Sequence, residues 1–358
     1  MTDTTARARR ANVIGLGLIG GSIALGLRSL GWSVTGDDAD RDIADQALAR
    51  GVVDALGLDP AAEITFVAVP VLAAADQVKR ALADTAGVVT DVGSVKAAIC
   101  AACDAPRFIG GHPMAGSELD GLDGAQADLF EGAVWVLTPG PDSDDTMFAA
   151  VASTVAALGA EVVALSPERH DRLVAVVSHV PHLTAATLMG LASDRAEEHA
   201  ALLRLAAGGF RDMTRVASGR PAIWLDICAE NRTAIVEVLD QLIEGLADMR
   251  DIVGTDDRER LHERLHAARQ ARSNLPARVV HPDELAEVRI PIPDRAGAAA
   301  EVFTLAAELS VNIASFEVVH VAESTRGVAV VLVDRAVVDV FRGGLLARGF
   351  RPAVQPLS

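Results

Sequence analysis

Short apolar runs alternate with helically spaced apolar residues along the first half of the chain. Buried strands are predicted at residues 12–16, 33–36, 64–69, 88–90, 108–110, 134–137 and 161–165. Helices are predicted between them at residues 19–30, 42–50 and 72–83. Because strands that alternate with helices form parallel βαβ units, residues 1–166 are expected to form a doubly wound α/β sheet.

The pattern changes in the second half of the chain. Residues 167–273 carry apolar positions at helical spacing without a convincing strand, which predicts an all-helical domain. Its largely apolar helices need a partner such as a second subunit. After a linker at 274–284, residues 285–358 predict strands and helices in the order βαββαβ, a ferredoxin-like layout.

Composition narrows the class of protein. The 358 residues are 50% hydrophobic and 23% charged, which allows a sizeable core. Lys and Arg number 32 against 49 Asp and Glu, and the resulting charge of −17 argues against nucleic acid or an anionic membrane as a partner. Three cysteines form no disulfide framework and fit a reducing cytoplasm. The chain has no tyrosine, which excludes the short-chain dehydrogenases that use a Tyr–Lys pair.

Two apolar stretches superficially resemble targeting or membrane segments. Residues 13–27 follow several arginines, but the stretch is shorter than the ~20 residues of a membrane span and carries five glycines in ordered spacing. Residues 174–192 are interrupted by His179, Pro181 and His182. Neither stretch is expected to cross a membrane.

A glycine motif follows the first predicted strand and opens a helix. It reads Gly15-Leu16-Gly17-Leu18-Ile19-Gly20, the G-x-G-x-x-G pattern in which glycines permit a tight turn and a close approach of a pyrophosphate. Asp37 and Asp38 end the second predicted strand about 20 residues on, where a carboxylate binds the adenosine ribose and repels a 2′-phosphate. The pattern predicts a Rossmann-type domain that binds NAD rather than NADP.

Polar segments follow two further strands of this sheet. Residues 91–96 contain Ser94, and residues 110–118 contain His112 between glycines and a proline. Ligands of open α/β sheets bind at the carboxyl ends of the strands, and a histidine there can act as a general base because its pKa lies near neutrality. The alternative is a loop histidine that only caps the next helix.

The helical half carries a third set of candidates. Arg215 follows Gly208-Gly209-Phe210-Arg211-Asp212, and its planar guanidinium could hold a substrate carboxylate bidentately. The alternative is a surface arginine paired with Asp212. His179 and His182 lie in an otherwise apolar helix, where each could also be a hydrogen-bonded core histidine.

Two metal-like or redox-like patterns are weaker. His262-Glu263-Arg264-Leu265-His266 matches H-E-x-x-H, but its helix is charged almost all round and no third ligand is evident, so no metal is predicted. Cys100 and Cys103 form C-x-x-C on an Ala-rich helix, which favours small buried side chains over a redox pair.

Together these motifs resemble the prephenate/arogenate dehydrogenase family with a C-terminal ACT domain. The resemblance rests on GLGLIGGS, DVGSVK, GGHPMAGSE, SHVPH and GGFRDMTRVASGRPAIWLDICAEN, in that order. It implies NAD-dependent oxidative decarboxylation of prephenate to 4-hydroxyphenylpyruvate and carbon dioxide in tyrosine biosynthesis. The helical domains of this family form the dimer, which implies a homodimer here.

The resemblance also assigns roles to residues. His112 would take the proton of the ring hydroxyl, Ser94 would hydrogen-bond that hydroxyl or His112, and Arg215 would bind a substrate carboxylate. Further residues that it places in the substrate pocket are His182, Trp224, Asp212 and Ser117.

The ACT resemblance lies at residues 294–303 and 311–313. A proline that is usual in the family is Ala296 here. An aromatic amino-acid effector would bind at Asp294, Arg295, Ala296, Gly297 and Asn312.

Three alternatives remain open at the level of sequence. Arogenate differs from prephenate by an amino group in place of a keto group, and no residue decides between them. The β-hydroxyacid dehydrogenases carry K-x-x-x-N in their second domain, but Ile227 stands four residues before Asn231 here. A non-catalytic NAD or amino-acid sensor would not need His112, Ser94 and Arg215 together.

Overall fold

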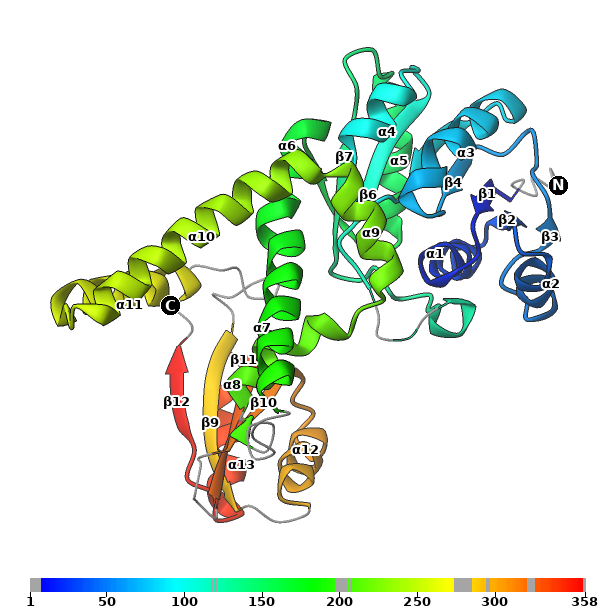
Figure 1. Ribbon diagram of the computed structural model, residues 1–358. Coiled ribbons are helices and arrows are strands. Elements are labelled where there is room, and N and C mark those ends of the chain that lie inside the picture. Colours follow the sequence, from blue (N-terminus) through cyan, green and yellow to red (C-terminus); the bar gives the residue numbers. More distant parts are fainter. Residues whose placement is uncertain are drawn as a thin grey trace. The chain divides into compact units, whose positions relative to one another are not determined.

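The computed structural model describes residues 8–116, 119, 121–196, 205–206, 208–273, 285–293, 297–320 and 326–356. Internal contacts divide the chain into two compact units, Met1–Arg258 and Glu259–Ser358. Figure 1 shows the arrangement of elements within each unit.

An eight-stranded sheet organises the first unit. Its strands are β1 (Arg10–Ile14), β2 (Ser33–Asp37), β3 (Ala55–Leu56), β4 (Ile64–Val67), β5 (Val88–Asp91), β6 (Phe108–Pro113), β7 (Val134–Thr138) and β8 (Glu161–Ala164). They lie in the order β3-β2-β1-β4-β5-β6-β7-β8, and the neighbours are parallel except for β6 and β7.

Helices cover both faces of this sheet. Residues of α1 (Leu18–Ser29), α2 (Arg41–Ala49) and α5 (Asp145–Ala157) share one buried cluster with the strands. Residues of α3 (Val71–Asp84) and α4 (Ala97–Ala102) join a second cluster that contains Ile14, Val67 and Val89. The doubly wound α/β prediction is therefore confirmed.

The antiparallel pairing of β6 with β7 departs from the expected run of parallel strands. The described part of the connection between them holds only the single turn η1 (Gly121–Gly124) rather than a crossover helix. Without a helix to carry the chain back across the sheet, β7 pairs in the opposite direction.

The rest of the first unit is helical, as expected. The helix α6 (Pro167–Val174) passes through a π-helical turn (Ala175–His179) into α7 (Val180–Ala196). The helices α8 (Gly208–Thr214), α9 (Pro221–Glu230) and α10 (Arg232–Gly254) follow, with a 3₁₀ turn at Arg215–Ser218. Val95 from the polar segment after β5 packs in one cluster with Ala175, Val180, Ile227 and Ile235, which ties these helices to the sheet.

One stretch of this helical region is long and apolar enough, by length and composition alone, to cross a membrane. It is Pro167–Asp194, and 28% of its most apolar window is buried inside the protein. The same stretch carries His170, Asp171 and His179, whose polar side chains are buried. Core helices of soluble proteins pass the same test, so the stretch is weak evidence for a span.

The second unit contains a small antiparallel sheet. After α11 (Arg258–Ser273), it contains β9 (Leu285–Pro293), α12 (Ala298–Glu308), β10 (Ile313–His320), β11 (Arg326–Asp334), α13 (Val338–Ala347) and β12 (Ala353–Pro356). The strand order β10-β11-β9-β12 and the sequence βαββαβ give the expected ferredoxin-like layout. Its core joins strand residues such as Ile290 and Val331 to Val302 of α12 and Phe341 of α13.

Candidate active site

The glycine loop between β1 and α1 has the geometry that a dinucleotide needs. Gly15 has a φ of +90°, and a Cβ there would overlap the carbonyl oxygen of Ala68. A Cβ at Gly20 would overlap the carbonyl oxygen of Gly15, whereas one at Gly17 would meet no heavy atom within 4 Å. The loop therefore has no room for a side chain at Gly15 or Gly20. It has open space at Gly17, where a pyrophosphate approaches the start of α1.

The two acidic residues at the end of β2, Asp37 and Asp38, have different partners. The Asp38 carboxylate accepts a hydrogen bond from the Leu16 amide at 2.7 Å, which ties it to the glycine loop. The Asp37 carboxylate lies 2.7 Å from Nη1 of Arg80 on α3. Both residues thus lie beside the nucleotide loop, as expected from their place at the end of β2.

His112 lies near the carboxyl end of β6 and is half-buried. Because β1, β4, β5 and β6 run parallel, the glycine loop, the segment after β5 and His112 meet at one edge of the sheet. Ligands of open α/β sheets bind at that edge.

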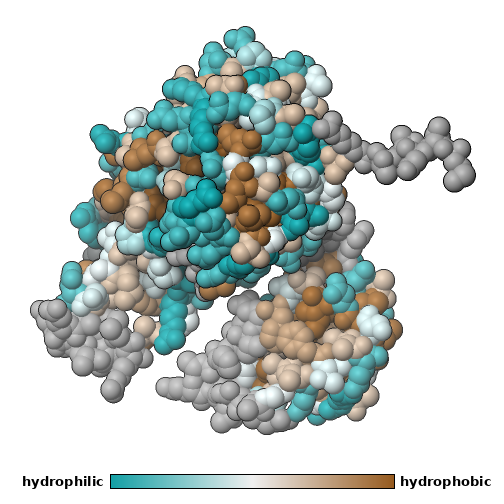
Figure 2. All heavy atoms as spheres, turned by 90° about the vertical axis from the view of Figure 1, so that its right-hand side faces the viewer, coloured by the Kyte–Doolittle hydropathy of each residue, from teal (hydrophilic) through white to brown (hydrophobic). Residues whose placement is uncertain are grey.

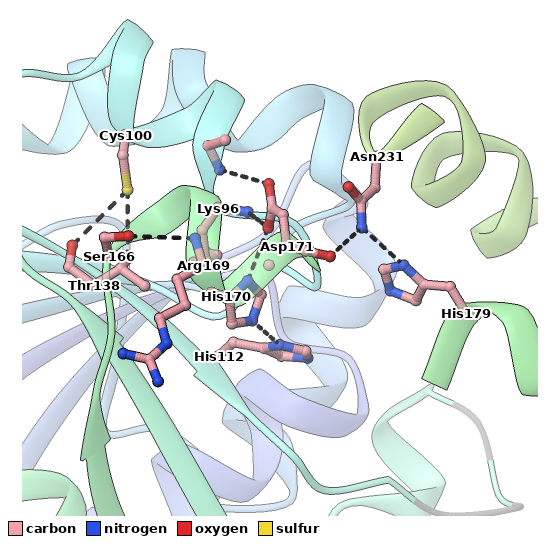
Figure 3. Close-up of polar contacts among 12 residues, drawn as sticks. Lys96, Cys100, His112, Thr138, Ser166, Arg169, His170, Asp171, His179 and Asn231 are labelled. Carbon is pink, nitrogen blue, oxygen red and sulfur yellow. Dashed lines mark hydrogen bonds and ion pairs between the residues drawn. The ribbon is translucent and has the colours of Figure 1, made fainter. Parts of the chain in front are cut away.

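A chain of hydrogen bonds fixes the protons on His112. In Figure 3 the His112 ring lies against the His170 ring, with 2.8 Å between His112 Nδ1 and His170 Nε2. His170 Nδ1 lies 2.8 Å from Oδ1 of Asp171. A carboxylate only accepts, so His170, when it is neutral, carries its proton on Nδ1 and accepts from His112 Nδ1–H. His112 Nε2 is left with a lone pair, which is the form of a base.

Backbone amides hold the carboxylate of Asp171, which begins this series of hydrogen bonds. Asp171 accepts hydrogen bonds from the amides of Lys96 at 2.8 Å and Ala97 at 2.9 Å, at the start of α4. Asp171 comes from α6 and His112 from β6, so the chain joins the helical region to the sheet.

The pKa of His112 lies well below its ordinary value of 6.5. Burial is the main cause, and the nearby His170, Lys96 and His179 act in the same direction. His112 is therefore neutral at physiological pH and can accept a proton.

A buried ion pair supports the segment that carries Ser94. Asp91 pairs with Lys96, and both side chains are fully buried. Asp91 also accepts hydrogen bonds from the amides of Gly93 at 2.8 Å and Gly111 at 3.2 Å. Ser94 lies in this segment, but within the described ranges its hydroxyl makes no hydrogen bond to His112.

A second polar group lies beside the first. Asn231, in the break between α9 and α10, donates to the backbone oxygen of Asp171 at 2.8 Å and lies 3.1 Å from His179 Nδ1. Burial lowers the pKa of His179 to about 4. Trp224 stacks on His182 with ring centroids 3.6 Å apart, and it lies nearly perpendicular to the His179 ring with centroids 6.0 Å apart. The two histidines thus share one aromatic wall.

The remaining pocket candidates are exposed or lie outside the described residues. Arg215 and Asp212 are exposed, and among the described residues no ion pair joins Asp212 to an arginine. Ser117 lies outside the described residues, as do Asp294, Arg295 and Ala296. Gly297 precedes α12 with a φ of +87°, and Asn312 is exposed before β10.

The metal-like pattern lies on α11, and the redox-like pattern begins on α4, where Cys100 is close to the buried Lys96. The rings of His262 and His266 stack with centroids 6.0 Å apart on α11, and the described residues hold no group of three metal ligands. Burial raises the pKa of Cys100 to about 11 and also raises that of Cys103, which disfavours reactive thiolates.

Two residues of the network, His170 and Asp171, lie outside the motifs that the sequence presents, whereas Asn231 ends the last of those motifs but received no role from the sequence. His170 and Asp171 form an adjacent pair in the first helix after the sheet, and Asn231 breaks a long apolar helical stretch. A buried His-Asp pair beside a helix start is a usable signal, but nothing in the sequence spacing places it next to His112, 58 residues earlier.

Comparisons with known proteins agree with this geometry. A family model described as the nucleotide-binding domain of prephenate dehydrogenase matches residues 23–164, and one described as its dimerization domain matches residues 166–267. The prephenate dehydrogenase of Bacillus subtilis is 33% identical over 331 residues, which cover 88% of this chain and 89% of that protein.

Solved structures are similar over the same region. A prephenate dehydrogenase from A. aeolicus in complex with hydroxyphenyl propionate and NAD+ has a TM-score of 0.70 at 27% identity, covering 76% of this chain and 100% of the other. An arogenate dehydrogenase from Synechocystis has a TM-score of 0.66 at 31% identity, covering 75% and 100%. The expected NAD-binding domain is confirmed, and the chain belongs to the prephenate dehydrogenase family.

Proposed function

We propose that this chain catalyses the NAD-dependent oxidative decarboxylation of prephenate to 4-hydroxyphenylpyruvate and carbon dioxide, a step of tyrosine biosynthesis. The observation that carries the mechanism is the hydrogen-bonded series from Asp171 through His170 to His112. It leaves one nitrogen of a neutral histidine free at the edge of the sheet where the dinucleotide loop lies.

His112 is the general base. Its Nε2 takes the proton of the ring hydroxyl while the hydrogen on the same carbon leaves with its electron pair. NAD, when bound, accepts that hydride. Loss of the ring carboxylate as carbon dioxide then sends the bond's electron pair through the ring to the new carbonyl oxygen, which recovers the proton from His112. The product is aromatic, so the protein supplies positioning rather than a further acid.

The helical region supplies the substrate contacts. Arg215 binds a substrate carboxylate, and the stacked His182 and Trp224 form an aromatic wall of the pocket. The family resemblance also assigns Asp212 and Ser117 to substrate binding, and Ser117 lies outside both the helical region and the described residues. Ser94 hydrogen-bonds the substrate hydroxyl, since its own hydroxyl is not engaged with His112.

The choice between prephenate and arogenate depends on the side-chain end of the substrate. The Bacillus subtilis relative is named for prephenate and the Synechocystis structure for arogenate, at 33% and 31% identity. We favour prephenate.

Assembly and regulation follow from the other parts of the chain. The match to a dimerization domain supports a homodimer. The three cysteines fit a place in the reducing cytoplasm. The ferredoxin-like unit supports an ACT domain in which the loop before α12 and Asn312 bind an aromatic amino-acid effector.

The test follows NADH absorbance with prephenate and with arogenate, each supplied with NAD and with NADP. Turnover is expected with prephenate and NAD. His112→Asn should lower kcat by about 10²-fold or more, since general-base catalysis contributes on that scale. NAD binding, measured by calorimetry, should persist in this variant. Unchanged turnover would remove His112 as the base, and a preference for arogenate would change the substrate while keeping the mechanism.

A further inference from the structure

The end of β2 carries an ion pair that the proposed mechanism does not use. Nη1 of Arg80, in the third turn of α3, lies 2.7 Å from Oδ2 of Asp37, the last residue of β2. Asp37 also accepts, through its backbone oxygen, a 2.7 Å hydrogen bond from the amide of Gly15, the first glycine of the nucleotide loop. The Arg80 guanidinium is therefore paired with Asp37, the residue of β2 whose backbone contacts the nucleotide loop.

Asp38 is engaged differently from Asp37. Its two oxygens accept hydrogen bonds from the backbone amides of Leu16 at 2.7 Å and Asp40 at 2.9 Å. Asp38 therefore shapes the loop and keeps lone pairs for a ribose hydroxyl, since a carboxylate has about four acceptor sites. The Asp37 carboxylate instead forms an ion pair with Arg80.

Arg80 retains unused capacity to bind an anion. Its hydrogen bonds to Asp37 and to Gln77, at 2.7 and 3.3 Å, both come from Nη1, and Nε lies 3.7 Å from Asp84. Within the described residues no hydrogen bond is made by its Nη2. The Arg80 side chain is 45% exposed and that of Asp37 is 26% exposed, so solvent reaches the pair. A guanidinium with spare donors is the group that accommodates a 2′-phosphate in dinucleotide sites.

We propose that Asp37 masks Arg80, and that this pair, in addition to Asp38, makes the site discriminate against NADP. With both carboxylates present, the end of β2 carries two negative charges against one positive charge and repels a 2′-phosphate. Removing the charge of Asp37 frees Arg80 to bind the 2′-phosphate of NADP. This inference rests on the proposed use of NAD at this loop.

A second arginine near the end of β2 provides a comparison with Arg80. Arg41 begins α2, three residues after Asp38, and lies 3.3 Å from Asp45 with its side chain 78% exposed. If any nearby arginine sufficed, Arg41 would serve as well as Arg80. The two arginines therefore make a matched pair of test positions.

The experiment measures affinities by calorimetry, without turnover. NAD, NADP, adenosine 5′-monophosphate and adenosine 2′,5′-bisphosphate are titrated into the wild type and into variants of the full chain. Asp37→Asn keeps the volume and removes the charge, and Asp37→Ser serves if the amide variant does not fold. We expect Asp37→Asn to tighten NADP and the bisphosphate by about tenfold or more, the scale of one charge-assisted interaction. Adding Arg80→Gln should abolish that gain, and adding Arg41→Gln should leave it.

Other outcomes overturn the inference. No gain in either Asp37 variant, a gain that survives Arg80→Gln, or a wild type that binds NADP as tightly as NAD would each do so. A wild type that binds neither dinucleotide would instead contradict the proposed function, so the two failures are distinguishable.

Discussion

Proton placement on two histidines follows from a single carboxylate. Asp171, held by two backbone amides, can only accept from His170, and His170 in turn can only accept from His112 while it stays neutral. If His170 were protonated, it would donate to His112 and move the His112 proton to Nε2. The base therefore depends on a neighbour that need not touch the substrate, which makes His170 a positioning residue.

Replacing His170 separates positioning from substrate binding. In His170→Ala, His112 loses its acceptor and its ring orientation, so kcat should fall by about 10- to 100-fold while KM changes little. Burial and His170 both lower the pKa of His112. The acidic limb of kcat/KM therefore lies below the ordinary value of 6.5 in the wild type and should move to higher pH in the variant. The pH profile of steady-state turnover measures both effects.

An exposed histidine provides the control for that profile. His262→Gln removes a histidine from α11, outside the network. It should leave the acidic limb in place. A His170→Ala enzyme with the wild-type limb would show that His170 only fills space.

At the scale of the βα unit, two glycines of one motif have opposite requirements. Gly20 faces the carbonyl oxygen of Gly15 inside the unit, whereas Gly17 faces open space above it. One glycine therefore serves the packing of α1 on β1, and the other serves the approach of the ligand.

Alanine substitutions should separate these two requirements. Gly20→Ala forces β1 and α1 apart and should lower the free energy of unfolding by about 1–3 kcal/mol, the usual cost of overpacking. Gly17→Ala should leave thermal stability near that of the wild type but weaken NAD binding by about tenfold or more, because the new methyl group stands where the pyrophosphate approaches. Thermal melts and calorimetry measure the two effects. Equal losses of stability in both variants would contradict the assignment.

Elements that depend on local pattern were predictable from the sequence. The strands and helices of the ferredoxin-like unit follow the predicted order βαββαβ, because each presents one apolar face to a single core. The antiparallel β7 was not predictable, since apolar runs indicate a strand but not its direction.

The candidate site shows the same division. His112 and the glycine loop follow strands at the ligand edge, so local pattern locates them. The contact of His112 with His170 depends on how α6 docks on the sheet, and the π-helical turn between α6 and α7 shifts the later histidines relative to the earlier ones. Docking of this kind is set by packing between distant segments, which no local spacing encodes.

At the scale of the whole molecule, the exposed apolar residues of α10 form an ordered stripe. On the face seen in Figure 2, hydrophobic residues form patches between hydrophilic ones. On α10, exposed Val236, Ile243, Leu246 and Val253 recur at spacings of seven, three and seven, which places them along one side of the helix. A cavity of about 520 Å³ between α7 and α10, lined by residues such as Val180, Leu188 and Leu242, adjoins this helical region. An exposed apolar surface of this kind is better suited to contact with a second copy of the chain than to exposure to solvent.

A charge in this stripe should therefore dissociate the proposed homodimer. Ile243 is 61% exposed in the single chain and would be buried against the partner in the dimer. Because the interface of a two-fold dimer contains the same surface of both copies, Ile243→Glu would place two charges in it. Burial of an isoleucine contributes about 1.5–3 kcal/mol, so the dimer should weaken by at least about tenfold. Light scattering during gel filtration measures the mass. Glu244→Lys alters the charge of an adjacent exposed residue on another side of α10 and should leave the dimer intact. A dimer that persists in Ile243→Glu at every concentration would place the interface on a different surface.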